Sequence, residues 1–328
     1  MPRPTVLVLG AAGRFGAAAA QAFAAAGWQV LAQQRRAAAK GQRPDVQVID
    51  TPLADTDALA ARARGASVVV HAVNPVYTRW DAELLPLLRQ GLAVTERLGA
   101  RFMLPGNVYN HGSQMPALLS EDTPMRPDTA KGELRVAMEA DLQRTAERGL
   151  DSVVIRAGDF FGGGSGTWID QAIAKDLARG KLVYPGPLDR MHAWAYLPDL
   201  ARAFVAVAHT GGHRGCLRLH FEGHSVNGQD FIAALQEAAT SLGLRPERGF
   251  RLGTMPWGLI RMIGWVNPMM REVARMSYLW RVPHALDGRA LQRLVGPLPT
   301  TPLVSALRDT LLGLDLGSPE TDAQVRYR

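Results

Sequence analysis

The chain has 328 residues, a formal net charge of +7 and a single cysteine, Cys216, so an internal disulfide is excluded. Its hydrophobic content of 47% and charged content of 20% are typical of a globular protein with a sizeable core. The arginines are scattered, which speaks against a nucleic-acid interface. The most apolar late stretch, 255–270, is too short and too often interrupted to span a bilayer. We therefore expect a cytoplasmic protein that has a small-molecule substrate and neither a nucleic-acid nor a membrane partner.

Strands alternate with helices through the first half of the chain. Apolar runs predict strands at 6–9, 28–32, 46–49, 67–72, 101–104 and 151–155, and helical spacing predicts helices after Gly16 and at 55–64, 80–98 and 129–148. This alternation is typical of an α/β fold with a doubly wound parallel sheet of the Rossmann type. Residues 1–155 are predicted to form the NAD(P)-binding domain, completed by about 190–222.

The second half is less regular and predicts a smaller, mostly helical substrate-binding lobe from residues 156–189 and 223–328. Residues 168–177 are expected to be helical, 181–184 and 217–221 to be strands, and the chain from 227 onward to be mostly helical. Asp199 is expected to cap the N-terminus of a helix at 200–208. His220 and His224 flank a strand end, so we expect no shared helical face and no metal site.

Three glycines follow the first strand at intervals of three residues. Gly10 permits a sharp turn, Gly13 allows close approach of a ligand to the backbone, and Gly16 allows the next helix to pack on the strand. A helix that begins in such a loop presents free N–H groups and the positive end of its dipole, which suits a pyrophosphate. The alternative is a plain strand–turn–helix connection.

The Gly-x-x-Gly-x-x-Gly spacing resembles the short-chain dehydrogenase/reductase superfamily, in its extended or atypical branches that include the NAD-dependent epimerases and dehydratases. The resemblance extends to Val108-Tyr109 after the fifth strand and to the segments RAGDFFG and AYLPDLA. It implies that Asp50 bonds the adenine and that Ala72 and Val73 lie along the nicotinamide ribose. The implied contacts in the glycine loop are Gly10, Ala12, Gly13, Arg14, Phe15 and Gly16.

The end of the second strand bears on the choice of cofactor. Residues 29–36 contain no acid to bond the 2′-hydroxyl of NAD, whereas Arg35 or Arg36 suits the 2′-phosphate of NADP. Arg14 could add a second phosphate contact. We therefore predict NADP, with NAD less favoured, although a solvated pair of surface arginines gives the same pattern.

The catalytic positions depart from the family pattern of Ser, Tyr and Lys. The resemblance places Pro105 in the serine position, Lys131 in the tyrosine position and Arg135 in the lysine position. Arg135 could hold the ribose, and Lys131 or Tyr109 could supply the proton. The candidate catalytic residues are therefore Lys131, Tyr109 and Arg135, with a solvated Lys131 as the alternative.

These residues predict an NADP-dependent oxidoreductase or an epimerase-like enzyme acting on a small carbonyl- or hydroxyl-bearing substrate. Two alternatives stay open. The first is a non-catalytic NADP-sensing protein similar to the NmrA regulators, which the altered triad favours. The second is a nucleotide-sugar epimerase or dehydratase, which would hold NAD tightly. Family resemblance also implies a possible homodimer.

Overall fold

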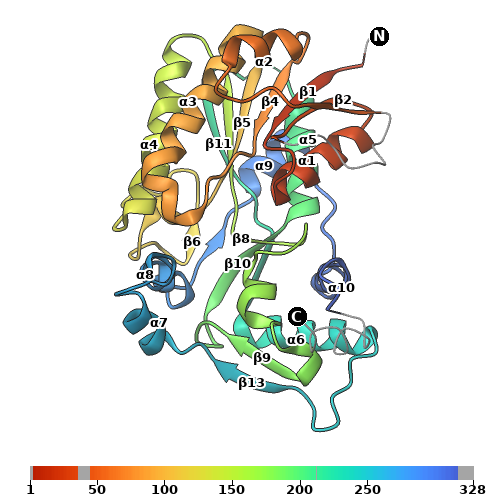
Figure 1. Cartoon of the computed structure of the whole chain (residues 1–328), viewed down its shortest axis with the longest axis vertical. Helices are drawn as coiled ribbons and strands as arrows, with labels where there is room; N and C mark the ends of the chain where they lie inside the picture. Colours follow the sequence, from red (N-terminus) through yellow and green to blue (C-terminus); the bar gives the residue numbers. More distant parts are fainter. Residues whose placement is uncertain (1–2, 36–44, 212, 317–328) are drawn as a thin grey trace.

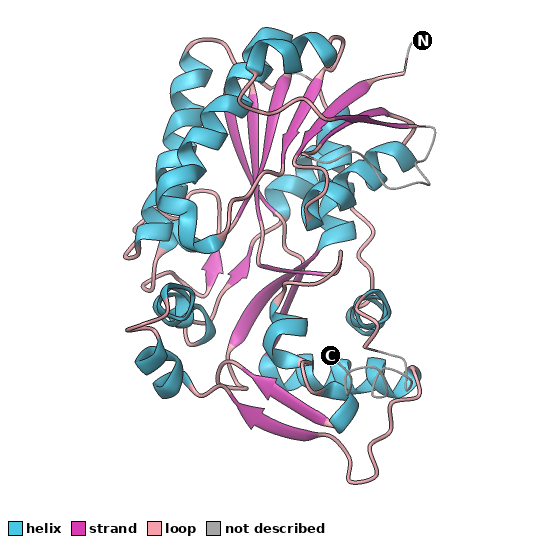
Figure 2. Ribbon diagram, in the orientation of Figure 1, coloured by secondary structure: helices cyan, strands magenta, loops and turns pink. Residues whose placement is uncertain are grey.

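The computed structural model describes residues 3–35, 45–211 and 213–316. Its centre is a parallel sheet of seven strands in the order β11-β7-β5-β4-β1-β2-β3 (Figures 1 and 2). The strands are β1 (Thr5–Leu9), β2 (Gln29–Gln33), β3 (Val46–Ile49), β4 (Val68–His71), β5 (Arg101–Gly106), β7 (Ser152–Arg156) and β11 (Cys216–His220). The predicted doubly wound α/β fold is confirmed.

Helices cover both faces of this sheet, as alternate residues of β1 show. Val6 and Val8 pack into the core under one helical layer, while Leu7 and Leu9 pack into the core under the other. Burial on both faces explains why the strand is a continuous apolar run. The first layer contains α1 (Arg14–Ala25), α5 (Leu197–His209) and α9 (Arg289–Val295), and the second contains α2 (Thr56–Arg62), α3 (Trp80–Leu98) and α4 (Ala130–Glu147).

A second group of elements lies beyond the carboxyl ends of the strands, in the lower half of Figure 1. Its core joins β10 and β9 to the packed pair α6 and α10. Its strands are β8 (Asp159–Phe161), β10 (Met191–Tyr196), β12 (His224–Asn227), β9 (Lys181–Tyr184), β13 (Arg251–Thr254), β6 (Leu118–Leu119) and β14 (Ala285–Leu286). Its helices are α6 (Gly228–Ser241), α7 (Trp257–Ile263), α8 (Pro268–Arg275) and α10 (Leu303–Gly313).

Three expectations from the sequence need correction. Asp199 does not cap a helix, because α5 already begins at Leu197; the Asp199 carboxylate instead accepts bonds from the backbone N–H and hydroxyl of Thr301. Residues 168–177 form only a short π-helical turn over Ile169–Ile173, followed by a 3₁₀ turn over Leu177–Arg179. In the C-terminal region, β13 and β14 interrupt the predicted helices, and α9 packs against β11 rather than within the second group.

Candidate functional site

The glycine loop lies at the carboxyl end of β1 and needs its glycines for steric reasons. Gly10 has φ +74°, and a Cβ there would lie 3.0 Å from the Cα of Val73. A Cβ on Gly16 would overlap the carbonyl oxygen of Gly10. These two glycines therefore fix the turn and bring it against the end of β4, where Ala72 and Val73 are half-buried.

Gln33, at the end of β2, fixes this loop by hydrogen bonds. Its side-chain oxygen accepts a bond from the backbone N–H of Gly10 at 3.2 Å, and its side-chain nitrogen donates to the carbonyl of Thr51 at 3.1 Å. Gln33 is only 3% exposed. The sequence analysis passed over this residue, although a polar side chain at the end of a buried strand is a signal that could have found it.

The N-terminus of α1 is open to a ligand. Gly13 occupies the N-cap position without a side-chain cap, and Ala12, Gly13 and Arg14 are exposed. An uncapped N-terminus beside a close-packed glycine turn fits a pyrophosphate. Phe15, in contrast, is buried and packs edge-on against Phe204 at 4.8 Å, so its side chain belongs to the core.

Gly13 offers a test of this cradle that is separable from folding. Its backbone angles suit alanine, and a new Cβ would have the carbonyl oxygen of Gly10 as its nearest neighbour, at 3.3 Å. We expect Gly13→Ala to weaken calorimetrically measured NADPH binding by at least about tenfold, because the methyl group occupies the approach to the phosphates. Gly258→Ala, which enters open space, is the matched control. Unchanged affinity in Gly13→Ala would contradict a pyrophosphate at this loop.

The Arg14 side chain forms hydrogen bonds to another glycine-rich segment of the described structure. Its guanidinium donates to the carbonyl oxygens of Ser165 at 3.0 Å and Gly166 at 2.6 Å. The glycine-rich segment 162–166 is thereby tied to the glycine loop. Both bonds use Nη1, so the guanidinium keeps further N–H donors for a cofactor phosphate.

The residues predicted to meet the adenosine end lie at the ends of β2 and β3. Arg35 is exposed and forms no ion pair within the described ranges, so its guanidinium is available to a ligand. Asp50 directly follows β3 and is also exposed. Arg36 lies outside the described residues.

Lys131 is not the solvated residue that the sequence left as an alternative. It is 3% exposed, and its ammonium donates to the carbonyl of Tyr77 at 2.7 Å and pairs with Glu272 at 3.2 Å. The ammonium also lies 4.0 Å from the centre of the Tyr77 ring. All these contacts suit a positive charge. Glu272 belongs to α8, so the second group of elements reaches directly to Lys131.

Arg135 and Tyr109 lie beside Lys131. The guanidinium of Arg135 packs 4.8 Å from the Trp80 ring and donates to the carbonyl of Pro105 at 3.4 Å, while its Nε is buried with no hydrogen-bond partner in the described structure. Burial lowers the pKa of Arg135. Burial, followed by the charge of Asp159, raises the pKa of Tyr109 above its ordinary value. The three predicted catalytic residues are therefore brought together.

Asp159 and His192 complete the cluster, and the sequence analysis missed both. Their side chains hydrogen-bond at 3.0 Å, and His192 stacks on the Trp280 ring at 4.3 Å. Asp159 also contributes to raising the pKa of Tyr77, after burial and the neighbouring Tyr109 phenol. Asp159 lies within the segment RAGDFFG, which resembles the family without marking this acid, whereas His192 and Glu272 come from segments with no local motif.

A buried charge network lies beneath this cluster. The carboxylate of Glu139 accepts from Arg156 at 2.9 and 2.7 Å, from Arg218 at 2.8 Å and from the amide of Asn110 at 3.0 Å. The bonds to Arg156 and Arg218 outweigh burial and lower the pKa of Glu139. The buried side chain of Asn110 is thus part of this network.

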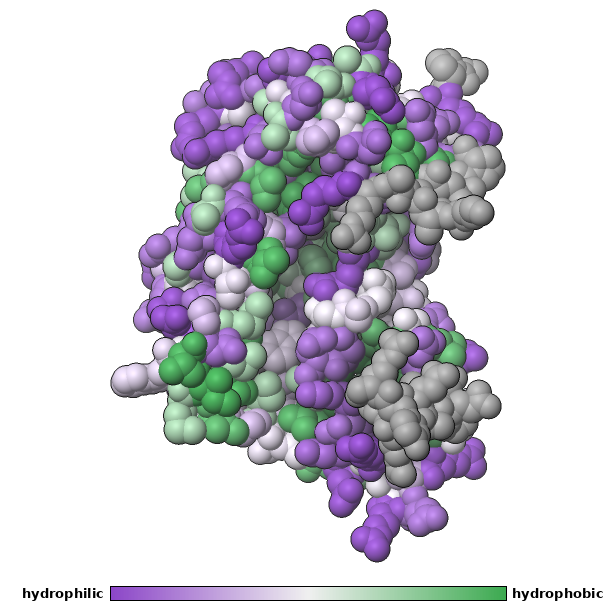
Figure 3. Space-filling model, viewed as in Figure 1, coloured by the Kyte–Doolittle hydropathy of each residue, from purple (hydrophilic) through white to green (hydrophobic). Residues whose placement is uncertain are grey.

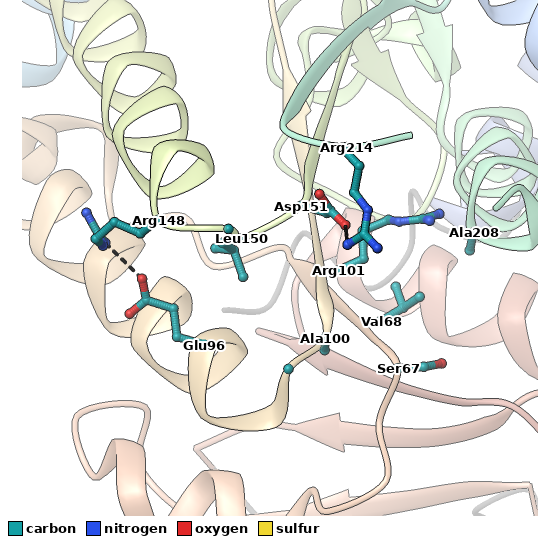
Figure 4. Close-up of a pocket in the computed structure, with 12 residues that line it drawn as sticks. Ser67, Val68, Glu96, Ala100, Arg101, Arg148, Leu150, Asp151, Ala208 and Arg214 are labelled. Carbon is teal, nitrogen blue, oxygen red and sulfur yellow. Dashed lines mark hydrogen bonds and ion pairs between the residues drawn. The ribbon is translucent and has the colours of Figure 1, made fainter. Parts of the chain in front are cut away.

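A cavity of about 670 Å³ lies at the opposite edge of the sheet, at the amino ends of the strands (Figure 4). Four of its charged residues form two ion pairs: Arg148 bonds Glu96 at 2.8 Å, and Arg214 bonds Asp151 at 3.2 Å. Ligands of open parallel sheets bind at the carboxyl ends of the strands. We therefore take the glycine loop and the Lys131 cluster as the candidate functional site.

A parallel doubly wound sheet with an open glycine loop defines the class of Rossmann-type α/β proteins. Residues 6–215, more than half of the chain, match the model of the NAD dependent epimerase/dehydratase family. The protein belongs to this family. No curated protein sequence matches the chain.

Solved structures share the architecture of this chain. MoeE5 in complex with UDP-glucuronic acid and NAD is 20% identical, with a TM-score of 0.71 over 94% of this chain and 98% of its own. WbmH from Bordetella bronchiseptica in complex with NAD+ is 18% identical, with a TM-score of 0.71 over 95% and 98%. L-threonine dehydrogenase from Clostridium difficile is 16% identical, with a TM-score of 0.70 over 96% and 99%. Likeness at this level of identity is one of fold.

Proposed function

We propose that the protein is an NADP-dependent oxidoreductase or epimerase-like enzyme for a small carbonyl- or hydroxyl-bearing substrate. The observation that carries the proposal is the convergence of Lys131, Tyr109 and Arg135 at the same edge of the sheet as the open glycine loop. Structural neighbours solved with NAD support a nicotinamide dinucleotide as the cofactor. When bound, such a dinucleotide supplies or accepts a hydride.

Each residue of the cluster then has a physical role. The guanidinium of Arg135, which lies at the carboxyl end of β5 beside Pro105, would hold a ribose hydroxyl in the role that the lysine has in the family pattern. Lys131, whose side-chain nitrogen contacts Tyr77 and Glu272, would donate a proton or a hydrogen bond to a developing oxyanion. The raised pKa of Tyr109 keeps the phenol protonated and therefore able to donate.

Arg35 gives the test of cofactor identity. Loss of its charge-assisted bond to a 2′-phosphate should cost NADPH binding roughly 1.5–3 kcal/mol and leave NADH binding nearly unchanged. We expect Arg35→Ala to show this split in paired calorimetric titrations, with Arg64→Ala, an exposed arginine in the turn after α2, as the control. An equal loss for both dinucleotides, or no loss, would overturn the NADP assignment.

A second candidate function is a non-catalytic sensor of NADP, favoured by one observation. The family resemblance puts Pro105 where the pattern has Ser or Thr, and the Pro105 carbonyl accepts a hydrogen bond from Arg135. Dinucleotide binding without turnover on a panel of aldehydes, ketones and nucleotide sugars would support the sensor. The nucleotide-sugar alternative would instead show turnover on the last class with retained NAD.

A further inference from the structure

The turn between α7 and α8 exposes large apolar side chains. Trp265 is 87% exposed, Val266 86% and Met262 64%. Leu259 and Ile263 add to the same face of α7. Figure 3 shows hydrophobic side chains gathered at this edge of the molecule, at the lower left. We call these five residues the α7–α8 apolar tip. Contiguous exposed apolar surface of this kind marks an interaction site.

The tip is held in a fixed shape. A Cβ on Gly264 would lie 2.9 Å from the Cα of Arg271, so this glycine allows the two helices to pack closely. The backbone N–H of Val266 donates to Ile263 at 3.1 Å, and the Asn267 side chain caps α8 by accepting from Met270. Trp265 and Val266 are therefore displayed by an ordered turn.

The stretch of sequence that contains the tip carries only positive charge. Residues 248–271 contain four arginines and no acidic residue. Arg261 and Arg271, beside the tip, are exposed and form no ion pair with any described residue. The next acid, Glu272, points the other way, to Lys131 and Arg275. An apolar face flanked by unpaired arginines is complementary to a surface that is negatively charged and apolar beneath.

We propose that the α7–α8 apolar tip docks the protein on the surface of an anionic lipid bilayer. Trp265 and Val266 would enter the headgroup boundary, while Arg261 and Arg271 meet the lipid phosphates. Docking on a second copy of this chain is disfavoured, because a symmetric contact would bring like charges together. No helix among the described residues is long and apolar enough to cross a membrane, so the contact is one of the surface alone.

Vesicle flotation tests the proposal. Wild-type protein is expected to float with phosphatidylcholine vesicles that contain about one-quarter phosphatidylglycerol, and less with pure phosphatidylcholine. The double variant Trp265→Ser/Val266→Ser should lower the partition coefficient at least about tenfold. Arg261→Gln/Arg271→Gln should remove the preference for anionic vesicles. Leu312→Ser, at another exposed apolar position (48%), is the matched control and should bind as wild type.

The same wild-type and variant proteins distinguish membrane docking from misfolding and from dimerisation. Retained NADPH affinity and an unchanged circular-dichroism spectrum would show that the variants remain folded. Wild-type protein that fails to float with anionic vesicles would overturn the proposal. So would a wild-type dimer in light scattering that the Trp265→Ser/Val266→Ser variant dissociates, because the tip would then be an interface between copies.

Discussion

Glu139→Ala is expected to lower the free energy of unfolding by roughly 3–5 kcal/mol, the cost of leaving a buried charge without its partner. The Arg156 side chain is 1% exposed and donates hydrogen bonds to both oxygens of this carboxylate. Removal of Glu139 therefore leaves a charged guanidinium in the core without its partner. Arg218, at 30% exposed, could turn to solvent and contributes less. The large effect therefore comes from Arg156.

Urea unfolding monitored by circular dichroism measures the change. Glu147→Ala, which removes an exposed acid from the same helix, should stay within about 0.5 kcal/mol of wild type. A loss below about 1 kcal/mol in Glu139→Ala would contradict the network, since it would mean that water reaches Arg156.

The same network gives stability a pH dependence of defined sign. Burial, with the nearby Arg156 charge, lowers the pKa of His220 from its ordinary 6.5 to about 4, and burial likewise lowers that of His111 to about 4. Between pH 6.5 and about pH 4, these two histidines bind protons in the unfolded chain but not in the folded protein. The free energy of unfolding therefore falls as the pH drops from about 6.5 to about 4. The lowered pKa of Glu139 adds a loss in the same direction at more acidic pH.

Lys131→Met is expected to reduce turnover by roughly 10²–10⁴-fold while NADPH affinity changes little. Methionine keeps the length and packing of the side chain but removes the ammonium that contacts Tyr77 and Glu272. The measurement is NADPH oxidation with the best substrate from the carbonyl and nucleotide-sugar panel. A specific loss of turnover would identify Lys131 as the group that serves the reacting oxygen.

Glu272 and Tyr109 provide the controls. Glu272→Gln leaves the ammonium in place but removes its partner, so it separates loss of the ion pair from loss of the proton donor. Tyr109→Phe tests the competing donor. If Lys131→Met keeps full turnover and Tyr109→Phe loses it, the proton donor is Tyr109 and not Lys131.

The first half of the fold was predictable because its information is local. The helix predicted over 80–98 is α3 with the same bounds, and the strand predicted over 46–49 is β3. Apolar runs and helical spacing operate within one element, and a parallel sheet follows from their alternation. Asp199 was misplaced because the same acid could serve a helix end or a distant backbone; its partner, Thr301, lies 102 residues away.

The site was only partly predictable for the same reason. The glycine loop and Lys131 carry signals within a few residues of sequence. Glu272, by contrast, pairs with Lys131 only because α8 packs against the turn at Tyr77. Asp159 and His192 become a pair only through the pairing of β8 with β10. Such contacts depend on tertiary packing and leave no periodicity in the sequence.

β11 and α9 come late in the sequence, which has a consequence for folding during biosynthesis. β11 (Cys216–His220) supplies the edge strand beside β7, and α9 (Arg289–Val295) packs over it and contributes Leu291 to the first-layer core. A nascent chain that ends before these residues therefore exposes both the unpaired edge of β7 and an unfilled part of that core. Such edges invite pairing with other chains. We infer that the nucleotide domain completes its folding only when most of the chain has left the ribosome.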